Sequence, residues 1–236
     1  MELSRDTGHQ WGHTDALVNL GTVQRLAGDY PAAATTLRQA LALCRDLGDR
    51  LQQAYVLTEF AAVQRLTGDY RAAAASSQQA LSLFRDLPQR SSESEAAYAL
   101  NELGLVQQLT GDYPAAAASH QQALALCRDA DNRLGQAETL NCLGELASRT
   151  ADGRQARTYH AQALAIARQL GTPLEEARAL EGIGHSHLRD GHTSEGTACL
   201  EQALTIYQRV AAPAARRVQE TLRQHALKPA SPPCNQ

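Results

Sequence analysis

The histidines are the residues whose type and spacing could most readily support chemistry, because imidazole binds metal ions and moves protons near neutral pH. His185 and His187 stand two residues apart in a segment that we expect to be helical, so their side chains should point to different faces. His192 follows in the next turn. His120 and His160 share one repeat position, and we interpret them as partly buried polar residues. No Ser/His/Asp or Cys/His motif accompanies them, so we predict no metal site and no catalysis.

Other reactive side chains are scarce. Lys228 is the only lysine, which leaves the body of the chain without a Schiff-base or phosphate-binding lysine. The five cysteines form no Cys-x-x-Cys pair, and we expect reduced thiols in a cytoplasmic protein. The formal net charge is −3, and the sequence has neither a membrane-length apolar run nor a signal-peptide core. These features predict no direct nucleic-acid contact, no membrane span and no cofactor.

The elements that position these residues are copies of one repeat. The triplet Gln-Ala-Leu occurs five times, with spacings of 40, 43, 40 and 40 residues, at Gln39–Leu41, Gln79–Leu81, Gln122–Leu124, Gln162–Leu164 and Gln202–Leu204. A period of this length is typical of stacked pairs of secondary-structure elements. Only 4% of the residues are aromatic, so the core should consist mainly of Leu and Ala.

Each repeat should contain two helices joined by a short turn. In the first repeat, apolar residues follow a helical period near 14–27 and 31–47, and the turn between them is Gly-Asp-Tyr. Glycine tolerates the left-handed conformation at a helix end, and aspartate can cap the next helix. The same turn recurs at Gly68 and Gly111. Gly104 and Gly144 should allow close contact between the paired helices.

The pattern of small and large residues resembles the tetratricopeptide repeat. Leu-x-x-Leu-Gly in the first helix is followed in the second helix by Ala, Leu and Ala at intervals of four and three, as at Ala33, Leu37 and Ala40. The resemblance covers about Thr14 to Val210. The 40-residue unit is similar to those of kinesin light chain and of large bacterial NTPase-containing transcription regulators. This resemblance implies an all-α, right-handed superhelical solenoid of helix-turn-helix hairpins with a C-terminal capping helix.

The repeats predict a division of the chain into consecutive segments. Met1–Gly8 aligns with Leu41–Gly48, so the chain should begin inside a repeat, as a fragment of a longer array would. The expected segments are a remnant of a preceding repeat at 1–13, repeats at 14–50, 51–91, 92–133, 134–173 and 174–211, a capping helix at 212–227 and a disordered tail at 228–236.

In the resembling family, the first helices of successive repeats line a concave groove that holds a peptide. Carried over position by position, the resemblance places ten residues in such a groove: Arg25, Tyr55, Arg65, Tyr98, Asn101, Gln108, Glu138, Asn141, Glu145 and His185. Tyr55 and Tyr98 should stand side by side as binding anchors. Asn101 and Asn141 fit the asparagine ladder with which long-repeat relatives bind a peptide main chain. The alternative is that these residues form only the solvated side of a helix row.

The sequence therefore predicts a non-catalytic scaffold that binds a protein or peptide, most simply the C-terminal sensor or interaction segment of a larger cytosolic transcription regulator. A stand-alone adaptor and a receptor for a short signalling peptide are the alternatives, and a metal-dependent enzyme has the least support. Self-association through an open N-terminal edge is a further expectation, because the first hairpin lacks a preceding neighbour.

Overall fold

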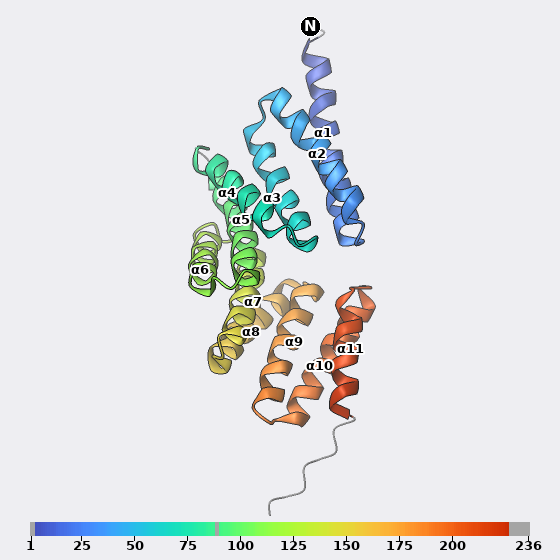
Figure 1. Cartoon of the computed structure of the whole chain (residues 1–236), viewed down its shortest axis with the longest axis vertical. Helices are drawn as coiled ribbons and strands as arrows, with labels where there is room; N and C mark the ends of the chain where they lie inside the picture. The colour runs from blue at the N-terminus through green and yellow to red at the C-terminus, as the bar shows by residue number, and fades with distance from the viewer. Residues whose placement is uncertain (1–2, 88–89, 227–236) are drawn as a thin grey trace, which may run out of the picture. The chain divides into compact units, whose positions relative to one another are not determined.

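The computed structural model describes residues 3–87 and 90–226, with side chains described for 12–87 and 93–225. These residues form eleven α-helices and no β-strand (Figure 1). The helices are α1 (Leu3–Leu26), α2 (Tyr30–Leu47), α3 (Arg50–Leu66), α4 (Tyr70–Arg85), α5 (Arg90–Leu109), α6 (Tyr113–Asp129), α7 (Arg133–Arg149), α8 (Gly153–Leu170), α9 (Pro173–Arg189), α10 (Thr193–Arg209) and α11 (Ala214–Ala226). The predicted disordered tail at 228–236 lies outside the described residues. The all-α fold of consecutive helix pairs is confirmed.

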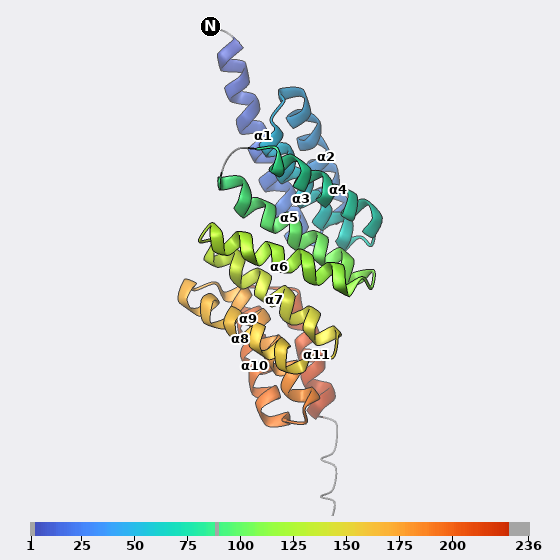
Figure 2. The same cartoon turned by 90° about the vertical axis from the view of Figure 1, so that its left-hand side faces the viewer.

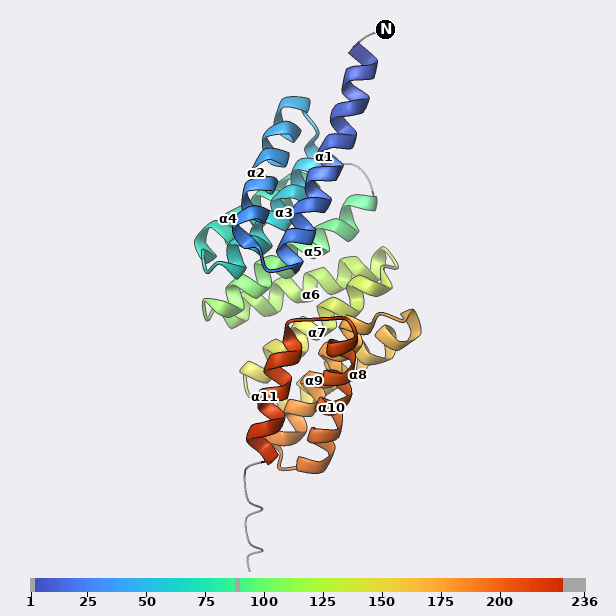
Figure 3. The ribbon, with the colours of Figure 1, turned by 90° about the vertical axis from the view of Figure 1, so that its right-hand side faces the viewer.

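The chain divides into two compact units, Met1–Gly135 (unit 1) and Gln136–Gln236 (unit 2). In unit 1 the paired helices lie against each other, as α5 and α6 do (Figure 2). In unit 2, α9 pairs with α10, and α11 packs on α10 (Figure 3). Val218 of α11 is fully buried there, together with Tyr207 of α10. The expected C-terminal helix is thus present and covers part of the unit 2 core.

The turns within the helix pairs have the predicted chemistry. Gly28, Gly68 and Gly111 have φ angles of 84°, 86° and 88°, which is the left-handed conformation that glycine adopts without strain. In each case the following aspartate caps the next helix. Oδ1 of Asp29, for example, accepts a hydrogen bond of 3.1 Å from the backbone N–H of Ala32. These caps satisfy backbone donors that the first helical turn leaves without partners.

The helices of each pair meet through two residues whose sizes are complementary. A β-carbon at Gly144 would lie 2.5 Å from Nε2 of His160, so the imidazole fills the space that the missing side chain leaves. The same arrangement joins Gly21 to Leu37, Gly104 to His120 and Gly184 to Leu200. In the second repeat, the corresponding positions hold two small buried residues, Ala61 and Ser77. The expected close contact at Gly104 and Gly144 is therefore observed, and it involves histidine.

The first helix is longer than the repeat pattern indicates. α1 runs without a turn through residues 13 and 14, so residues 3–13 continue the helix of the first repeat. Its side chains Leu20 and Val23 are 48% and 62% exposed. Val63 and Val106, which occupy the position of Val23 in the next two repeats, are 1% and 2% exposed. One apolar face of α1 thus lacks the cover that later repeats receive.

Candidate functional site

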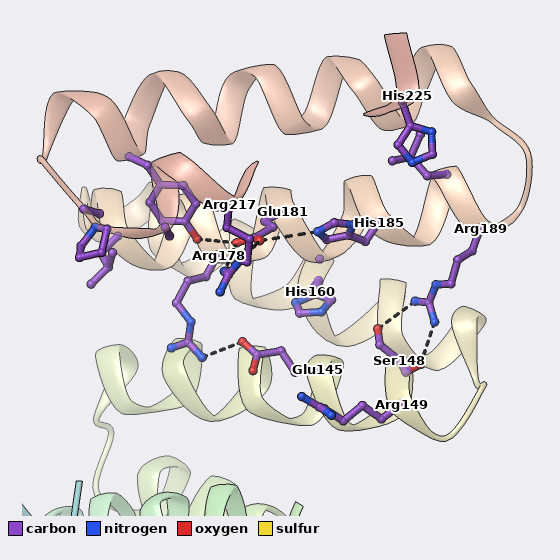
Figure 4. A pocket seen from close by; sticks show the side chains of 17 residues that line it. Glu145, Ser148, Arg149, His160, Arg178, Glu181, His185, Arg189, Arg217 and His225 are labelled. Atoms are coloured by element: carbon purple, nitrogen blue, oxygen red, sulfur yellow. Dashed lines mark hydrogen bonds and ion pairs between the residues drawn. The ribbon is translucent and has the colours of Figure 1, made fainter. Parts of the chain in front are cut away.

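Unit 2 contains a cavity of about 770 Å³ (Figure 4). Its walls come from α7, α9 and α11, with His160 added from α8 and Tyr207 from α10. Apolar side chains such as Leu174 and Leu188 contribute to the lining, and the remaining residues are mostly charged or polar. A hollow of this size with a few convergent polar groups is what small-molecule and peptide sites usually provide.

Glu181 is the central acid of the cavity. Its carboxylate accepts a hydrogen bond of 2.9 Å from the Tyr207 hydroxyl and bonds of 3.0 and 2.9 Å from Nε and Nη2 of Arg217. Nε2 of His185 lies 3.6 Å from Oε1. Burial alone would raise the pKa of Glu181, but these hydrogen bonds and the Arg217 charge outweigh it and lower the pKa to about 2. Glu181 is therefore ionised, and its hydrogen bonds link α9 to Tyr207 of α10 and Arg217 of α11.

Arg178 forms a second charged cluster beside the first. Its guanidinium donates to Glu145 at 2.9 Å and to Glu175 at 3.2 Å. Burial would lower the pKa of Arg178, but the two carboxylates raise it well above its ordinary value. Glu175 also accepts a 2.9 Å bond from the Asn141 amide. The charge of Arg178 is therefore satisfied within the protein.

His160 is buried at the inner wall of the cavity. It is 1% exposed, and its Nδ1 lies 3.1 Å from Oδ1 of Asn141. Burial lowers the pKa of His160 to about 4, so the ring is neutral at physiological pH. Gly144 and Gly182 both lie close to the ring, because a β-carbon at either position would collide with it. The imidazole is thus held between α7 and α9.

Two further arginines, Arg189 and Arg149, line the cavity. Arg189 donates from Nη1 to the backbone carbonyl of Ser148 at 2.7 Å and from Nη2 to the Ser148 hydroxyl at 3.0 Å. Arg149, next to Ser148 in the chain, is exposed and lines the same cavity. His185 and His225 contribute from α9 and α11 (Figure 4).

The predicted groove residues of unit 1 are largely engaged with other parts of that unit. Arg25 pairs with Glu59 at 3.1 Å, and Arg65 pairs with Glu102 at 2.8 Å, in both cases across to the first helix of the next repeat. Gln108 is 4% exposed. These arginines therefore cross-link neighbouring repeats.

The tyrosines of unit 1 are half-buried. The ring of Tyr55 meets Phe84 edge to face, with centroids 5.9 Å apart. Its hydroxyl hydrogen-bonds Glu95, and burial together with that carboxylate raises the pKa of Tyr55. Tyr98 lies on α5, close enough to influence Tyr55 electrostatically. The ring of Tyr55 thus contributes to packing in unit 1.

Asn101 and Asn141 lie inside the helix pairs. Oδ1 of Asn101 is 3.0 Å from Nδ1 of His120, and the same contact joins Asn141 to His160. Asn101 is 7% exposed and Asn141 is fully buried. Both amides are thus engaged by the histidine nineteen residues later. A peptide ladder would need them on the surface.

Of the predicted site residues in unit 2, the structure brings Glu145 and His185 into the cavity, while Glu138 is half-buried on α7 and is not among its lining residues. The sequence analysis missed Arg149, Arg189, Glu181 and Arg217. One available signal was that two arginines, Arg149 and Arg189, end consecutive first helices at positions 40 residues apart. No pattern in the sequence indicated how α11 would lie.

Two further properties bear on function. In the described parts of the chain, no group of three or more His, Cys, Asp or Glu side chains is placed to hold a metal ion. None of the helices there has both the length and the apolar character that crossing a bilayer requires.

Comparison with known proteins gives a consistent result. The family model described as "Tetratricopeptide repeat" matches residues 14–86, 95–169 and 135–209. No curated protein matches the chain in sequence. Among solved structures, BtubC from P. vanneervenii is similar over 100% of this chain and 92% of its own, with 20% identity and a TM-score of 0.67.

Two other solved structures show the same likeness. A thermophilic TPR protein of Thermus thermophilus has 19% identity and a TM-score of 0.61, over 91% of this chain and 100% of its own. A protein of Podosopora anserina with nearly identical TPR-like repeats, named for kinesin light chain, has 14% identity and a TM-score of 0.61, over 84% and 96%. At these identities the likeness concerns the fold.

Proposed function

Because the chain belongs to the tetratricopeptide repeat family, we propose that it is a non-catalytic interaction scaffold whose unit 2 cavity receives a segment of a protein or peptide partner. The observation that carries this proposal is the cavity between the first helices α7 and α9 and the terminal helix α11. Its volume of about 770 Å³ would take a few residues of a partner chain. Apolar lining beside ordered polar groups suits a peptide, which presents both kinds of surface.

Two buried titratable groups of the cavity, Glu181 and His160, are poorly suited to catalytic proton transfer. An efficient general acid or base has a pKa near the working pH. The pKa values of Glu181 and His160 are about 2 and about 4, so both groups are poor proton carriers near neutrality. Glu181 is also occupied by Tyr207 and Arg217.

The wider context of the scaffold is also proposed. We favour the C-terminal interaction segment of a larger cytosolic regulator, and retain a stand-alone adaptor and a receptor for a short signalling peptide as alternatives. Burial raises the pKa of Cys44 to about 11 and that of Cys142 to about 12, so both remain protonated thiols. Such inert, buried thiols are compatible with a reducing cytoplasm.

A second contact surface is the apolar face of α1. Leu20 and Val23 are exposed there, whereas Val63 and Val106, at the position of Val23 in the next two repeats, are buried. A second copy of the chain could cover this face in the same way. This supports the proposed self-association through the N-terminal edge.

Leucine substitutions test the cavity as the partner site. Leu174 lines the cavity and Leu170 does not, yet both are 44% exposed and they lie on either side of the α8–α9 turn. The wild-type chain and Leu170→Arg should capture the same partner from the source cell, whereas Leu174→Arg should lose it. Equal capture by both variants would place the partner elsewhere on the scaffold.

A further inference from the structure

The orientation of the Asn141 amide fixes which nitrogen of His160 carries the proton. Nδ2 of Asn141 donates to the backbone carbonyl of Glu175 at 3.1 Å, and a backbone carbonyl can only accept. Oδ1 of the same amide therefore faces His160 and accepts a hydrogen bond of 3.1 Å from Nδ1. Because the buried ring is neutral, its other nitrogen, Nε2, has a lone pair and no proton.

This lone pair of Nε2 has no hydrogen-bond donor from the described residues of the chain. The His160 side chain is 1% exposed, so water has little access to it, and yet the ring lines the cavity. A buried acceptor that lacks a donor costs stability, and a ligand that supplies the donor recovers this cost. Nε2 is therefore the kind of group that a ligand of the cavity should engage.

The two glycines beside the ring leave the direction of this lone pair open. A β-carbon at Gly182 would lie 2.2 Å from Nε2 and 2.4 Å from both Cδ2 and Cε1 of His160. One at Gly144 would lie 2.5, 2.7 and 2.6 Å from the same three atoms. Such similar distances place both glycines against the face of the ring, in the gap between α7 and α9 (Figure 4). The lone pair lies in the plane of the ring, so neither glycine blocks it.

The opening at Gly182 is a departure from the repeat pattern. The corresponding positions of the first four repeats hold residues with side chains, namely Asn19, Glu59, Glu102 and Cys142. Glu59 and Glu102 pair with an arginine of the preceding first helix, so a side chain here can bridge neighbouring repeats. Gly182 provides no such bridge, and His160 lines the cavity beside it. His120, which has the same contact with Asn101, is not among the lining residues.

We infer that Nε2 of His160 accepts a hydrogen bond from a tyrosine or tryptophan side chain that a peptide partner inserts into the cavity. The inference deepens the proposed function, because it rests on the cavity being the site of the partner. The charges that act on the ring are two carboxylates, Glu145 and Glu181, and two guanidinium groups, Arg178 and Arg189. This balance favours a neutral donor over an ion.

The remaining lining of the cavity suits an aromatic side chain. Leu174, Leu188 and Pro213 offer apolar contact, while Glu181 and Arg217 already satisfy each other. Tyrosine and tryptophan combine a large apolar body with one neutral O–H or N–H donor, and they are frequent anchors in protein interfaces. A single such side chain would therefore use both the apolar wall and the unpaired nitrogen.

The first test establishes the proton position and uses p-cresol, which is the side chain of tyrosine. Two-bond nitrogen–proton correlation spectra of the whole chain should show a protonated Nδ1 and an unprotonated Nε2 for His160. Addition of p-cresol should move the Nε2 resonance, because that nitrogen then accepts a hydrogen bond. A proton found on Nε2, or an Nε2 resonance that p-cresol leaves in place, would overturn the inference.

The second test measures the contribution of the donor hydrogen by calorimetry. The probes are p-cresol and skatole, the side chains of tyrosine and tryptophan, and each is compared with its derivative in which a methyl group replaces the donor hydrogen. At least one probe should bind saturably and at least about tenfold more tightly than its methylated derivative. The probe with the larger ratio identifies the anchoring side chain. Ratios near one for both, or no saturable binding up to about 10 mM, would refute the inference.

Variants separate the hydrogen bond from the size of the added methyl group. His160→Leu should bring the affinity ratio close to one, and leucine fits this position because Leu37 and Leu200 fill it in other repeats. His120→Leu is the matched control, because it removes the same kind of contact with asparagine outside the cavity and should leave the ratio unchanged. A tenfold ratio that persists in His160→Leu would show that steric exclusion of the methyl group, and not Nε2, causes the preference.

The outcome is separable from the proposed function. If Leu174→Arg loses the captured partner while His160→Leu retains it and binds the probes as the wild-type chain does, the scaffold stands and the hydrogen bond to Nε2 falls. If Leu174→Arg and Leu170→Arg both keep the partner, the cavity is not the partner site, and the proposed function falls together with the inference.

Discussion

The buried imidazole of His160 should make unit 2 sensitive to mild acid, and replacing it with leucine should remove that sensitivity. Leucine is a suitable replacement, because Leu37 and Leu200 already fill this position opposite Gly21 and Gly184. His160→Leu therefore keeps the packing and removes the titrating group. It also deprives Asn141 of a hydrogen-bond partner, which should cost about 1–3 kcal/mol at neutral pH.

The magnitude follows from the pKa of His160. The pKa is about 4 in the folded chain and 6.5 for an ordinary histidine, so between these values the unfolded chain binds more protons. Stability is therefore complete above pH 6.5 and falls as the pH is lowered toward 4. At pH 5 the loss relative to pH 7.5 should be about 2 kcal/mol, from roughly 1.5 pH units at 1.36 kcal/mol each.

Urea unfolding followed by circular dichroism at pH 7.5 and pH 5 measures this loss. The other histidines and the carboxylates titrate in both proteins, so only the difference between the two proteins reports on His160. The wild-type chain should lose about 2 kcal/mol more than His160→Leu. Equal losses would show that His160 is not a buried neutral group in the folded chain.

Four other tests by substitution concern the packing and the surfaces. Gly144→Ala should lower the free energy of unfolding by about 1–3 kcal/mol, because its β-carbon would lie 2.5 Å from the His160 ring. Adding His160→Ser reproduces the pair of small residues found at Ala61 and Ser77, so the double variant should recover much of the lost melting temperature. Tyr55→Ala should lower the free energy of unfolding by about 2 kcal/mol through loss of the Phe84 contact. Tyr98→Ala then tests ligand binding in unit 1. Normal calorimetric affinity of this variant for a captured partner would show that Tyr98 is not a binding anchor. Leu20→Glu combined with Val23→Glu should shift any self-associated chain to monomer in size-exclusion chromatography, and an unchanged elution volume would exclude the α1 face as the contact.

The fold could be predicted because its determinants are local and repeated. The Gly-Asp turns require a left-handed residue followed by a cap, and both Gly28 and Asp29 behave as their chemistry dictates. The close approach at Gly144 also followed from residue size. Each of these features depends only on residues within one hairpin, and the same residue pattern recurs in several repeats.

The candidate site was harder to predict, because it depends on partners in other helices. Asn101 and Asn141 are polar residues on first helices, and sequence position alone does not tell whether they face a ligand or the paired helix. A joint occurrence in the sequence could have settled this: the two repeats that carry these asparagines are the two that carry histidine, in place of leucine, nineteen residues later. For Arg25, the signal was a glutamate, Glu59, in the next first helix.

The cavity itself could not be predicted. It requires α11 to pack on α10 so that Arg217 reaches Glu181, and α11 departs from the repeat pattern. A helix of only 13 residues gives little sequence information about the angle at which it packs on α10.

The matched sizes at the hairpin contact limit how a gene of this kind can recombine with itself. Unequal crossover between repeated segments adds or removes whole repeats, and the join can fall anywhere within a unit. Suppose that the join falls between Gly21 and Leu37 and brings in the second half of the next repeat. Gly21 would then lie opposite Ser77, which leaves a void. In the reciprocal product, Leu37 would clash with Ala61. A crossover inside this stretch leaves an intact pair only when both repeats carry glycine on the first helix, so the second repeat, with Ala61 and Ser77, should be exchanged as a complete hairpin.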